Sequence, residues 1–307
     1  MKRLTSLATL AATVLFCASL LAQSSYSFQD VKYTANNAAD QFTQLLGINN
    51  NGLIVGYHNV NQNSGFALVL PSAFTTENFP QSMMTQVIGV NNSGTSVGFY
   101  VDNNSNTHGF TNISGHANAV NGQFSTVDFP GTVFNQLLGQ NDLGQAAGYY
   151  SLSQNNSTPD TPYIYDELGG GVFQVINIPA AIGGAQATSI NNSQQVSGFY
   201  IDANGVNHGF LLSAGLLVTL DAPGSIFTQA LGLNNKGQVV GQFMDANENT
   251  HGFVWTSAKG FSTIDDPNGI GSTIVNGIND AGVLVGFYGT SPVNTGFVAQ
   301  PVPAQAR

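Results

Sequence analysis

One short pattern occurs six times in this chain and limits what it can fold into. The segments NNNGLIVGY, NNSGTSVGFY, NDLGQAAGYY, NNSQQVSGFY, NNKGQVVGQF and NDAGVLVGFY begin at Asn49, Asn91, Asn141, Asn191, Asn234 and Asn279. Their first asparagines lie 42, 50, 50, 43 and 45 residues apart. A period of about 40–50 residues is typical of blade-like units, each of which must pack on its neighbours to bury its apolar face. The repeat therefore predicts one domain built from six similar units.

Each unit contains four short apolar segments. One precedes the asparagines, as in TQLLGI (Thr43–Ile48), one follows them, a third contains HGF, and the fourth ends in proline, as in QFSTVDFP before Gly131. The segments are rich in Val, Ile, Phe, Tyr and Thr and are separated by Asn, Gly, Asp and Pro, which is typical of strands joined by tight turns. No segment after residue 22 keeps apolar residues at helical spacing. We therefore expect an all-β fold with four antiparallel strands per unit.

The two ends of the chain predict how the units are arranged. The sixth unit continues from Gly296 and Phe297 into VAQPVPAQAR and lacks a fourth strand, whereas YSFQDVKY (Tyr26–Tyr33) supplies an extra strand before the first unit. In a closed ring the extra strand completes the last unit and leaves only short, protected sheet edges. The sequence thus predicts a six-bladed β-propeller over residues 23–300, with its last blade completed by the N-terminal strand and a C-terminal tail over residues 301–307.

The first 22 residues have the features of a secretory signal peptide. Lys2 and Arg3 form a charged start, and an apolar stretch follows from Leu4 to Ala22. The alternative, a membrane anchor, is disfavoured because five Ser and Thr residues interrupt that stretch. We therefore expect secretion, to the extracellular space or the periplasm, without membrane insertion after cleavage. Cleavage also removes Cys17, the only cysteine, so no disulfide is available to the mature chain.

The charge of the mature chain excludes one class of partner. Residues 23–307 contain 4 basic and 16 acidic residues, which gives a net charge of −12. Phosphate backbones and anionic lipids repel such a surface, so nucleic acid is not an expected partner. Only 7% of the residues are charged, whereas Asn, Ser, Thr and Gln are abundant. This composition predicts an uncharged polar surface, and we expect a monomer.

The repeats resemble the bacterial extracellular HAF-repeat family. The resemblance rests on INN-x-G, on D-x-N-G-x-x-H-G-F and on F-x-T-I-D-x-P-G, and it covers nearly the whole chain after residue 22. The counterparts of the motif that names the family are His108–Phe110, His208–Phe210 and His251–Phe253. The resemblance implies an exported repeat protein. It implies no activity, because the family has no established catalytic residues.

Most of the repeated residues have a structural explanation. In each NN-x-G segment we expect Asn to accept hydrogen bonds from its own backbone and Gly to adopt positive φ in a hairpin turn. The glycines inside the second strand, such as Gly98 and Gly198, predict close approach of a neighbouring blade. The aromatic pairs that follow, such as Phe99 and Tyr100, predict packing between blades rather than a platform for sugars.

The HGF histidines and the turns before them bear on metal binding. We expect the histidines to be structural, because equivalent positions of separate blades lie about 15 Å apart, whereas the ligands of one zinc ion lie within about 2 Å of it. Three of the turns resemble the first half of a calcium loop, and one of them contains Asp202 and Asn204. The other two are the metal candidates, and their residues are Asp102, Asn104 and Asn106, and Asp245, Asn247 and Asn249. All three turns lack the usual glycine and the bidentate acid, so ordinary Asp/Asn turn chemistry is the main interpretation and calcium the alternative. No other cofactor is expected.

The third unit departs most from the pattern. The loop between its second and third strands, Ser151–Thr161, is long, and PYIYD replaces the HGF motif. Departures from a repeat are frequent sites of function, although neutral drift of a surface loop explains them equally well. If the chain has one specific site, we expect it at a mouth of the central channel or at Tyr163, Tyr165 and Asp166, whose two tyrosines share a strand face.

The function classes that remain differ in chemistry. The chain contains no catalytic cysteine after residue 22 and no phosphate-binding loop, so a non-catalytic module that binds an extracellular glycan or a protein is the main hypothesis. A propeller enzyme acting on a carbohydrate or lactone is one alternative, since catalytic residues from several blades can converge at the channel. A calcium-dependent adhesion module is another.

Overall fold

The computed structural model describes residues 26–35, 38–39, 42–113, 123–154, 158–289 and 292–302. These residues form β-strands and turns, and no helix occurs among them. No described segment therefore forms a helix long and apolar enough to cross a membrane. The expected signal peptide, residues 1–22, and positions 303–307 of the expected tail lie outside the described residues.

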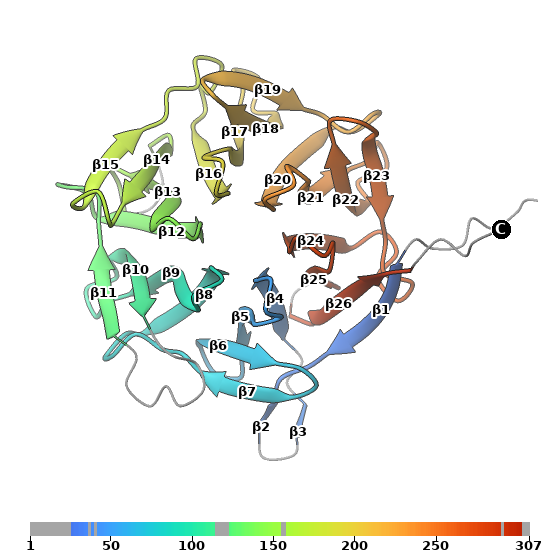
Figure 1. The fold of residues 1–307 in the computed structure, drawn as a ribbon, viewed down its shortest axis with the longest axis horizontal. Coiled ribbons are helices and arrows are strands. Elements are labelled where there is room, and N and C mark those ends of the chain that lie inside the picture. The colour runs from blue at the N-terminus through green and yellow to red at the C-terminus, as the bar shows by residue number, and fades with distance from the viewer. Residues whose placement is uncertain are drawn as a thin grey trace, which may run out of the picture.

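Most strands belong to four-stranded antiparallel sheets that surround a central axis (Figure 1). One sheet contains β4 (Thr43–Ile48), β5 (Ile54–Asn59), β6 (Asn63–Val69) and β7 (Ala73–Thr76). A second contains β16 (Ala185–Ile190), β17 (Val196–Ile201), β18 (Asn207–Ser213) and β19 (Leu216–Leu220). A third contains β20 (Phe227–Leu233), β21 (Val239–Met244), β22 (Thr250–Thr256) and β23 (Gly260–Ile264). In each, the first strand lies nearest the axis and the last lies outermost (Figure 1).

Eight further strands are connected in a single sheet. Its first group contains β8 (Met84–Val90), β9 (Thr95–Val101), β10 (Thr107–Ile113) and β11 (Gln123–Val127). Its second group contains β12 (Phe134–Gln140), β13 (Gln145–Ser151), β14 (Thr161–Asp166) and β15 (Val172–Val175). Within each group the strands pair antiparallel, and one parallel pair of residues, Thr107 and Phe134, joins the two groups. A separate small hairpin contains β2 (Thr34–Ala35) and β3 (Ala38–Ala39).

The two ends of the chain meet in the fourth of the four-stranded sheets. It contains β24 (Thr273–Ile278), β25 (Leu284–Tyr288), β26 (Thr295–Pro301) and the N-terminal strand β1 (Tyr26–Val31). Strand β1 pairs antiparallel with β26, from Tyr26 opposite Pro301 to Val31 opposite Gly296. The predicted pairing of the first strand with the last is therefore confirmed. The fold is an all-β propeller.

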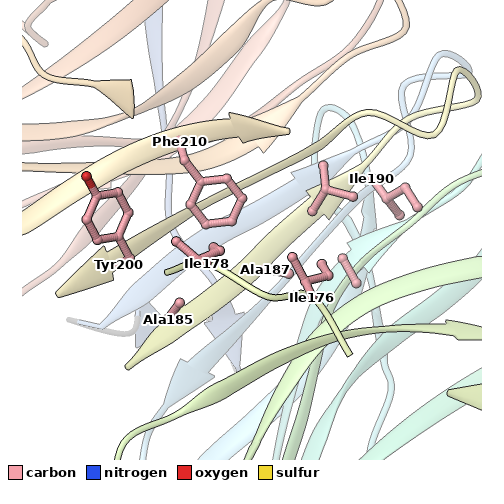
Figure 2. Packing of buried hydrophobic residues seen from close by; sticks show 9 residues of the cluster. Ile176, Ile178, Ala185, Ala187, Ile190, Tyr200 and Phe210 are labelled. Carbon is pink, nitrogen blue, oxygen red and sulfur yellow. The ribbon is translucent and has the colours of Figure 1, made fainter. Parts of the chain in front are cut away.

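The core lies between the faces of adjacent sheets. In the cluster of Figure 2, Ile176 and Ile178 pack with Ala185 and Ile190 of β16 and with Phe210 of β18, and Ala147 joins them from strand β13 of the preceding sheet. Tyr200 belongs to this cluster. In another repeat, Tyr100 stacks on Phe79, and the two ring centroids are 3.7 Å apart. The predicted packing between sheets is thus confirmed for the second aromatic of each pair. The first aromatic departs from the prediction, because Phe99 and Phe199 line the central cavity.

The second-strand glycines approach their own sheet and not a neighbouring one. A Cβ atom on Gly98 would lie 2.0 Å from the backbone oxygen of Gln86 in β8 and 3.0 Å from the ring of Phe110 in β10. Our prediction that a neighbouring blade approaches these glycines is therefore wrong. Adjacent sheets approach each other at the inner-strand glycines instead, since a Cβ atom on Gly89 would lie 2.9 Å from the backbone oxygen of Leu138.

Candidate functional site

A cavity of about 320 Å³ lies inside the ring of inner strands. Its walls come from β4, β8, β12, β16, β20 and β24, with a few side chains from the second strands. The inner strands alternate between buried residues that face the sheet core and half-buried residues that face the cavity, as in Thr43–Ile48. Alternation with period two therefore determines which residues reach the axis.

Glutamines and aromatic residues surround one end of the cavity. Gln44, Gln86, Gln136 and Gln186 line it at the second or third position of their strands. Their direct neighbours on the second strands are Tyr57, Phe99, Tyr149 and Phe199, and all of these except Tyr149 line the cavity. Burial raises the pKa of the Tyr57 phenol to about 12 and also raises the pKa of Tyr149, so both remain neutral at physiological pH.

Three of the inner-strand glutamines are held by hydrogen bonds from their side-chain nitrogens. Nε2 of Gln44 donates to Oδ1 of Asn294 at 3.1 Å, and Nε2 of Gln186 donates to Oδ2 of Asp160 at 2.7 Å. Gln229, at the equivalent position of β20, donates to Oδ1 of Asn207 at 3.1 Å. These contacts orient the amides before any ligand arrives. The side-chain oxygen of Gln229 also accepts from Nε2 of Gln242, and the Gln186 side chain is also hydrogen-bonded to Tyr149.

The middle of the cavity is mostly aliphatic. Its walls include Leu46, Ile88, Leu138 and Leu231. Two polar residues occupy the equivalent positions in the remaining inner strands: Thr188 Oγ1 donates to the backbone oxygen of Ala230 at 3.0 Å, and Asn276 Nδ2 donates to that of Leu45 at 3.3 Å. No residue lining the cavity has a charged side chain. The cavity is therefore suited to neutral ligands, because an ion would lose its hydration without an opposite charge.

A belt of asparagines surrounds the other end. The first asparagine of each repeat donates its Nδ2 to the backbone oxygen of the first asparagine of the next, at 2.9–3.2 Å. The last of these bonds runs from Asn279 to Asn49, so the hydrogen bonds form a closed circle. Within each turn the asparagine also accepts from its own backbone: Asn49 Oδ1 accepts from Asn51 and Leu53, and Gly52 has φ of 80°. The predicted turn chemistry is confirmed.

A second circle of hydrogen bonds strengthens this belt. It is formed by the residue after the first asparagine of each repeat: Asn50, Asn92, Asp142, Asn192, Asn235 and Asp280. Each of their backbone nitrogens donates to Oδ1 of the equivalent residue in the next repeat, at 2.8–2.9 Å. The carboxylate of Asp142 accepts from two asparagine side chains, and so does that of Asp280. Burial opposes ionisation of Asp280, but the bonds from Asn235 and Asn50 outweigh it and lower the pKa of that carboxyl. Only about 60 Å³ of space remains within the belt, which narrows the channel at this end.

Each HGF histidine lies between two aspartates of its own sheet. His108 Nδ1 is 2.6 Å from Asp128 and its Nε2 is 3.4 Å from Asp102. His208 and His251 repeat this arrangement, with Nδ1 at 3.0 Å from Asp221 and Asp265. A structural role fits this geometry, because the two ring nitrogens connect the turn before the strand to the segment after the outermost strand.

The two turns considered for calcium are closed by their own hydrogen bonds. Asp102 Oδ1 accepts from the backbone of Asn104 and Asn106, both at 2.8 Å, and Asp245 Oδ1 accepts from Asn247 and Asn249 at 2.8 and 2.9 Å. Bonds from Asn249, through its side chain and its backbone, lower the pKa of Asp245 to about 2. Within the described ranges, no three His, Cys, Asp or Glu side chains are grouped so as to hold a metal ion. A calcium ion would have to replace the turn's own donors.

The three candidate residues of the third repeat have different environments. Tyr163 is 0% exposed and pairs with Gly148, the register position at which the other repeats have a buried phenylalanine. Those phenylalanines are Phe66, Phe110, Phe210, Phe253 and Phe297. Tyr163 and Tyr165 do share a face, but it packs on Phe173. The structure therefore corrects the prediction for Tyr163, which is a core residue without surface for a ligand, whereas Asp166 is half-buried and borders a separate cavity.

The cavity glutamines were missed as functional candidates at the level of sequence. Gln44, Gln86, Gln136 and Gln229 follow a Thr or Asn at the start of an apolar segment, so the signal was present. Because the pattern does not tell which face of an inner strand turns to the axis, it did not distinguish them from ordinary solvent-exposed residues.

Comparison with known proteins identifies similar folds but no related sequence. No model of a protein family matches the sequence, and no curated protein does. Several solved structures are similar, among them TolB from Acinetobacter baumannii, with 9% identity and a TM-score of 0.55 over 73% of this chain. The chain covers 54% of that TolB chain, about half its length.

Two fungal proteins match over most of their length. AofleA from Arthrobotrys oligospora is 12% identical to this chain, with a TM-score of 0.51. The match covers 92% of this chain and 97% of the AofleA chain. The lectin of Aleuria aurantia, described as a six-bladed β-propeller with a fucose recognition mode, has 10% identity, covers 92% and 98%, and gives a TM-score of 0.50. At such low identity these likenesses show the fold alone.

Proposed function

We propose that this protein is an exported, non-catalytic, six-bladed propeller that binds a neutral glycan at the glutamine-lined end of its central cavity. The main support is the lining of that cavity, where amides and aromatic rings occur without any charged side chain. Sugar rings present hydroxyl groups to amides and C–H faces to aromatic rings, so these two kinds of residue match a glycan. Recognition of fucose by the Aleuria aurantia lectin is compatible with this ligand class.

Three observations favour a ring of six blades. The eight-stranded sheet consists of two antiparallel groups connected by a single residue pair, whereas neighbouring strands within each group are joined by four to seven pairs. The asparagine circle has one member from each of six repeats and returns to its start. Strand β1 completes the last sheet, as a ring closed by both ends of the chain requires.

Export and membership of the HAF-repeat family remain part of this proposal. Both rest on the sequence: the charged and apolar pattern of residues 1–22, and the repeated HGF and D-x-N motifs. A protein partner at the same end of the ring is the second candidate ligand. Calcium-dependent adhesion is an alternative that a chelator would test, because bound calcium raises the melting temperature of the folded state.

Glycan binding is tested with the mature chain on an array of neutral glycans, followed by titration calorimetry. Gln86 and Gln136 are the appropriate positions to change, since they line the cavity and make no side-chain hydrogen bond among the described residues. We expect Gln86→Ala and Gln136→Ala each to weaken binding at least about fivefold, or about 1 kcal/mol, without lowering the melting temperature.

The matched control is Gln123→Ala, on the exposed outer strand β11, which should bind like the parent. If the parent binds no neutral glycan, the proposed ligand class is wrong. If glycans bind but neither cavity variant differs from the control, the proposed site is wrong.

A further inference from the structure

A second cavity, of about 700 Å³, lies between the strands β14–β15 and the neighbouring strands β17–β18. Its volume lies within the range of about 300–1,000 Å³ that is usual for ligand pockets. One wall includes Gln145, Asp166 and Gln174, and the other includes Gln194, Gln195 and Ser213. Because Gln194 and Gln195 belong to the turn that starts with Asn191, this cavity lies at the asparagine end of the ring, away from the glutamine-lined end of the central cavity.

Two residues that border this cavity have an unfavourable backbone conformation. Gln194 has φ of 59° at the turn position where the other five repeats have glycine, with φ between 72° and 87°. Ala214, in the turn between β18 and β19, has φ of 49°. Left-handed backbone is costly for residues other than glycine, and such strain is often found at binding sites. At Gln194 the strained backbone places a polar side chain along the cavity where glycine would leave none.

The polar groups on both walls are partly used by the protein and partly available. Asp166 Oδ1 accepts from the backbone of Gly169 at 2.7 Å, which leaves Oδ2 as an acceptor. Gln145 Oε1 accepts from Asn141 at 3.0 Å, which leaves its amide nitrogen as a donor. Gln195 Nε2 donates to Ser213 Oγ at 3.2 Å, and the serine hydroxyl can donate in turn. The cavity therefore offers oriented donors together with one carboxylate oxygen.

The remaining wall is apolar. Ile164 and Leu212 are half-buried and pack on the core cluster of Figure 2, and both line the cavity together with Val196. No Lys or Arg is among the lining residues, so nothing there neutralises an anion. An anion is therefore opposed, whereas a neutral ligand matches the walls if it has several hydroxyl groups for the amides and the carboxylate and C–H surfaces for the aliphatic side chains. Sugar rings have both properties.

We infer that this cavity is a second binding site, separate from the central one, for a neutral sugar chain, with Asp166 accepting hydrogen bonds from sugar hydroxyls and Gln194 contributing its amide. This site does not depend on the central cavity. Substitutions distinguish the two sites, because Gln86 and Gln136 line only the central cavity, whereas Asp166 and Gln194 line only the second one.

The test uses the mature protein and a panel of neutral trisaccharides, cellotriose, maltotriose, xylotriose and chitotriose, followed by saturation-transfer NMR and calorimetry. Asp166→Asn keeps the shape and the oxygen that accepts from Gly169 but removes the charge. Gln194→Gly removes the amide and relieves the backbone. We expect both variants to weaken the binding of at least one trisaccharide about fivefold or more, and the glycine variant to unfold at a higher urea concentration than the parent.

Two controls isolate the site. Glu167→Gln changes the neighbouring acid, which does not line the cavity, and Gln86→Ala changes the central cavity; neither should affect this binding. The inference is overturned if no trisaccharide binds, if binding is lost in Gln86→Ala but retained in Asp166→Asn and Gln194→Gly, or if only a cationic probe, the chitosan trimer, binds here.

Discussion

Gly98→Ala tests whether the two inner strands of a sheet approach each other so closely that only glycine fits between them. Gly98 lies in β9 opposite Val87 of β8, next to an irregularity in the pairing between Val87 and Gly89. A Cβ atom there would lie 2.0 Å from the backbone oxygen of Gln86. Ordinary Cβ contacts are not closer than about 3 Å, so the two strands must separate by roughly 1 Å to admit one methyl group.

The expected loss of stability follows from this displacement. Overpacking by a single methyl group in a close-packed interior costs about 1–3 kcal/mol, and the lower part of that range applies where a flexible side chain gives way. Here the obstacle is backbone, with the Phe110 ring behind it at 3.0 Å, so the upper part applies. Lengthening one ladder hydrogen bond between β8 and β9 adds about 1 kcal/mol. We therefore expect Gly98→Ala to lower the free energy of unfolding by about 3–4 kcal/mol.

Urea denaturation followed by far-ultraviolet circular dichroism measures this loss as a shift of the midpoint. Gly131→Ala is the control, because Gly131 has φ of 81° and a Cβ atom there would meet nothing within 4 Å. The control should lose only the cost of left-handed backbone, about 1–2 kcal/mol. If Gly98→Ala unfolds at the same urea concentration as the control or the parent, the close approach of β8 to β9 is not the reason that position 98 requires glycine.

Two further predictions concern single side chains. The hydroxyl of Tyr163 is buried without a partner among the described residues. In urea denaturation, Tyr163→Phe should therefore leave the free energy of unfolding unchanged or raise it by up to about 1 kcal/mol, whereas Tyr163→Ala should lower it by about 3–5 kcal/mol. A less stable phenylalanine variant would mean that the hydroxyl has a partner. The pKa of Asp245 is lowered to about 2, so its ionised form stabilises the fold above the ordinary value of 3.8, and this contribution is lost as the pH falls through 2. Thermal unfolding should therefore show Asp245→Asn less stable than the parent at pH 7 and equal to it near pH 2; an undiminished difference at pH 2 would contradict this account.

The architecture was predictable because it depends on local chemistry that repeats. Asparagine and glycine define the turns at Asn49 and its equivalents, and period-two apolar segments define the strands between them. The missing strand after Phe297 and the surplus strand at Tyr26 identify how the chain closes, since an unpaired edge is costly in either place. Each of these inferences needs only neighbouring residues or the order of segments along the chain.

The sites were decided by the tertiary structure. The repeat shows that Gln86 and Gln136 are equivalent, but only the rotation of each inner strand about its own axis turns them toward the cavity rather than into the sheet core. Tyr163 and Asp166 are three residues apart on strand β14 and were predicted together, yet one is in the core and the other borders a cavity, because side chains at odd spacing on a strand point to opposite faces. By itself the sequence determined the repeated strands, their turns and the closing strand, all of which follow from backbone hydrogen bonding and turn chemistry. Which side chains share a cavity depends on how sheets pack against one another, since that packing brings together residues from different repeats that are not adjacent in the sequence.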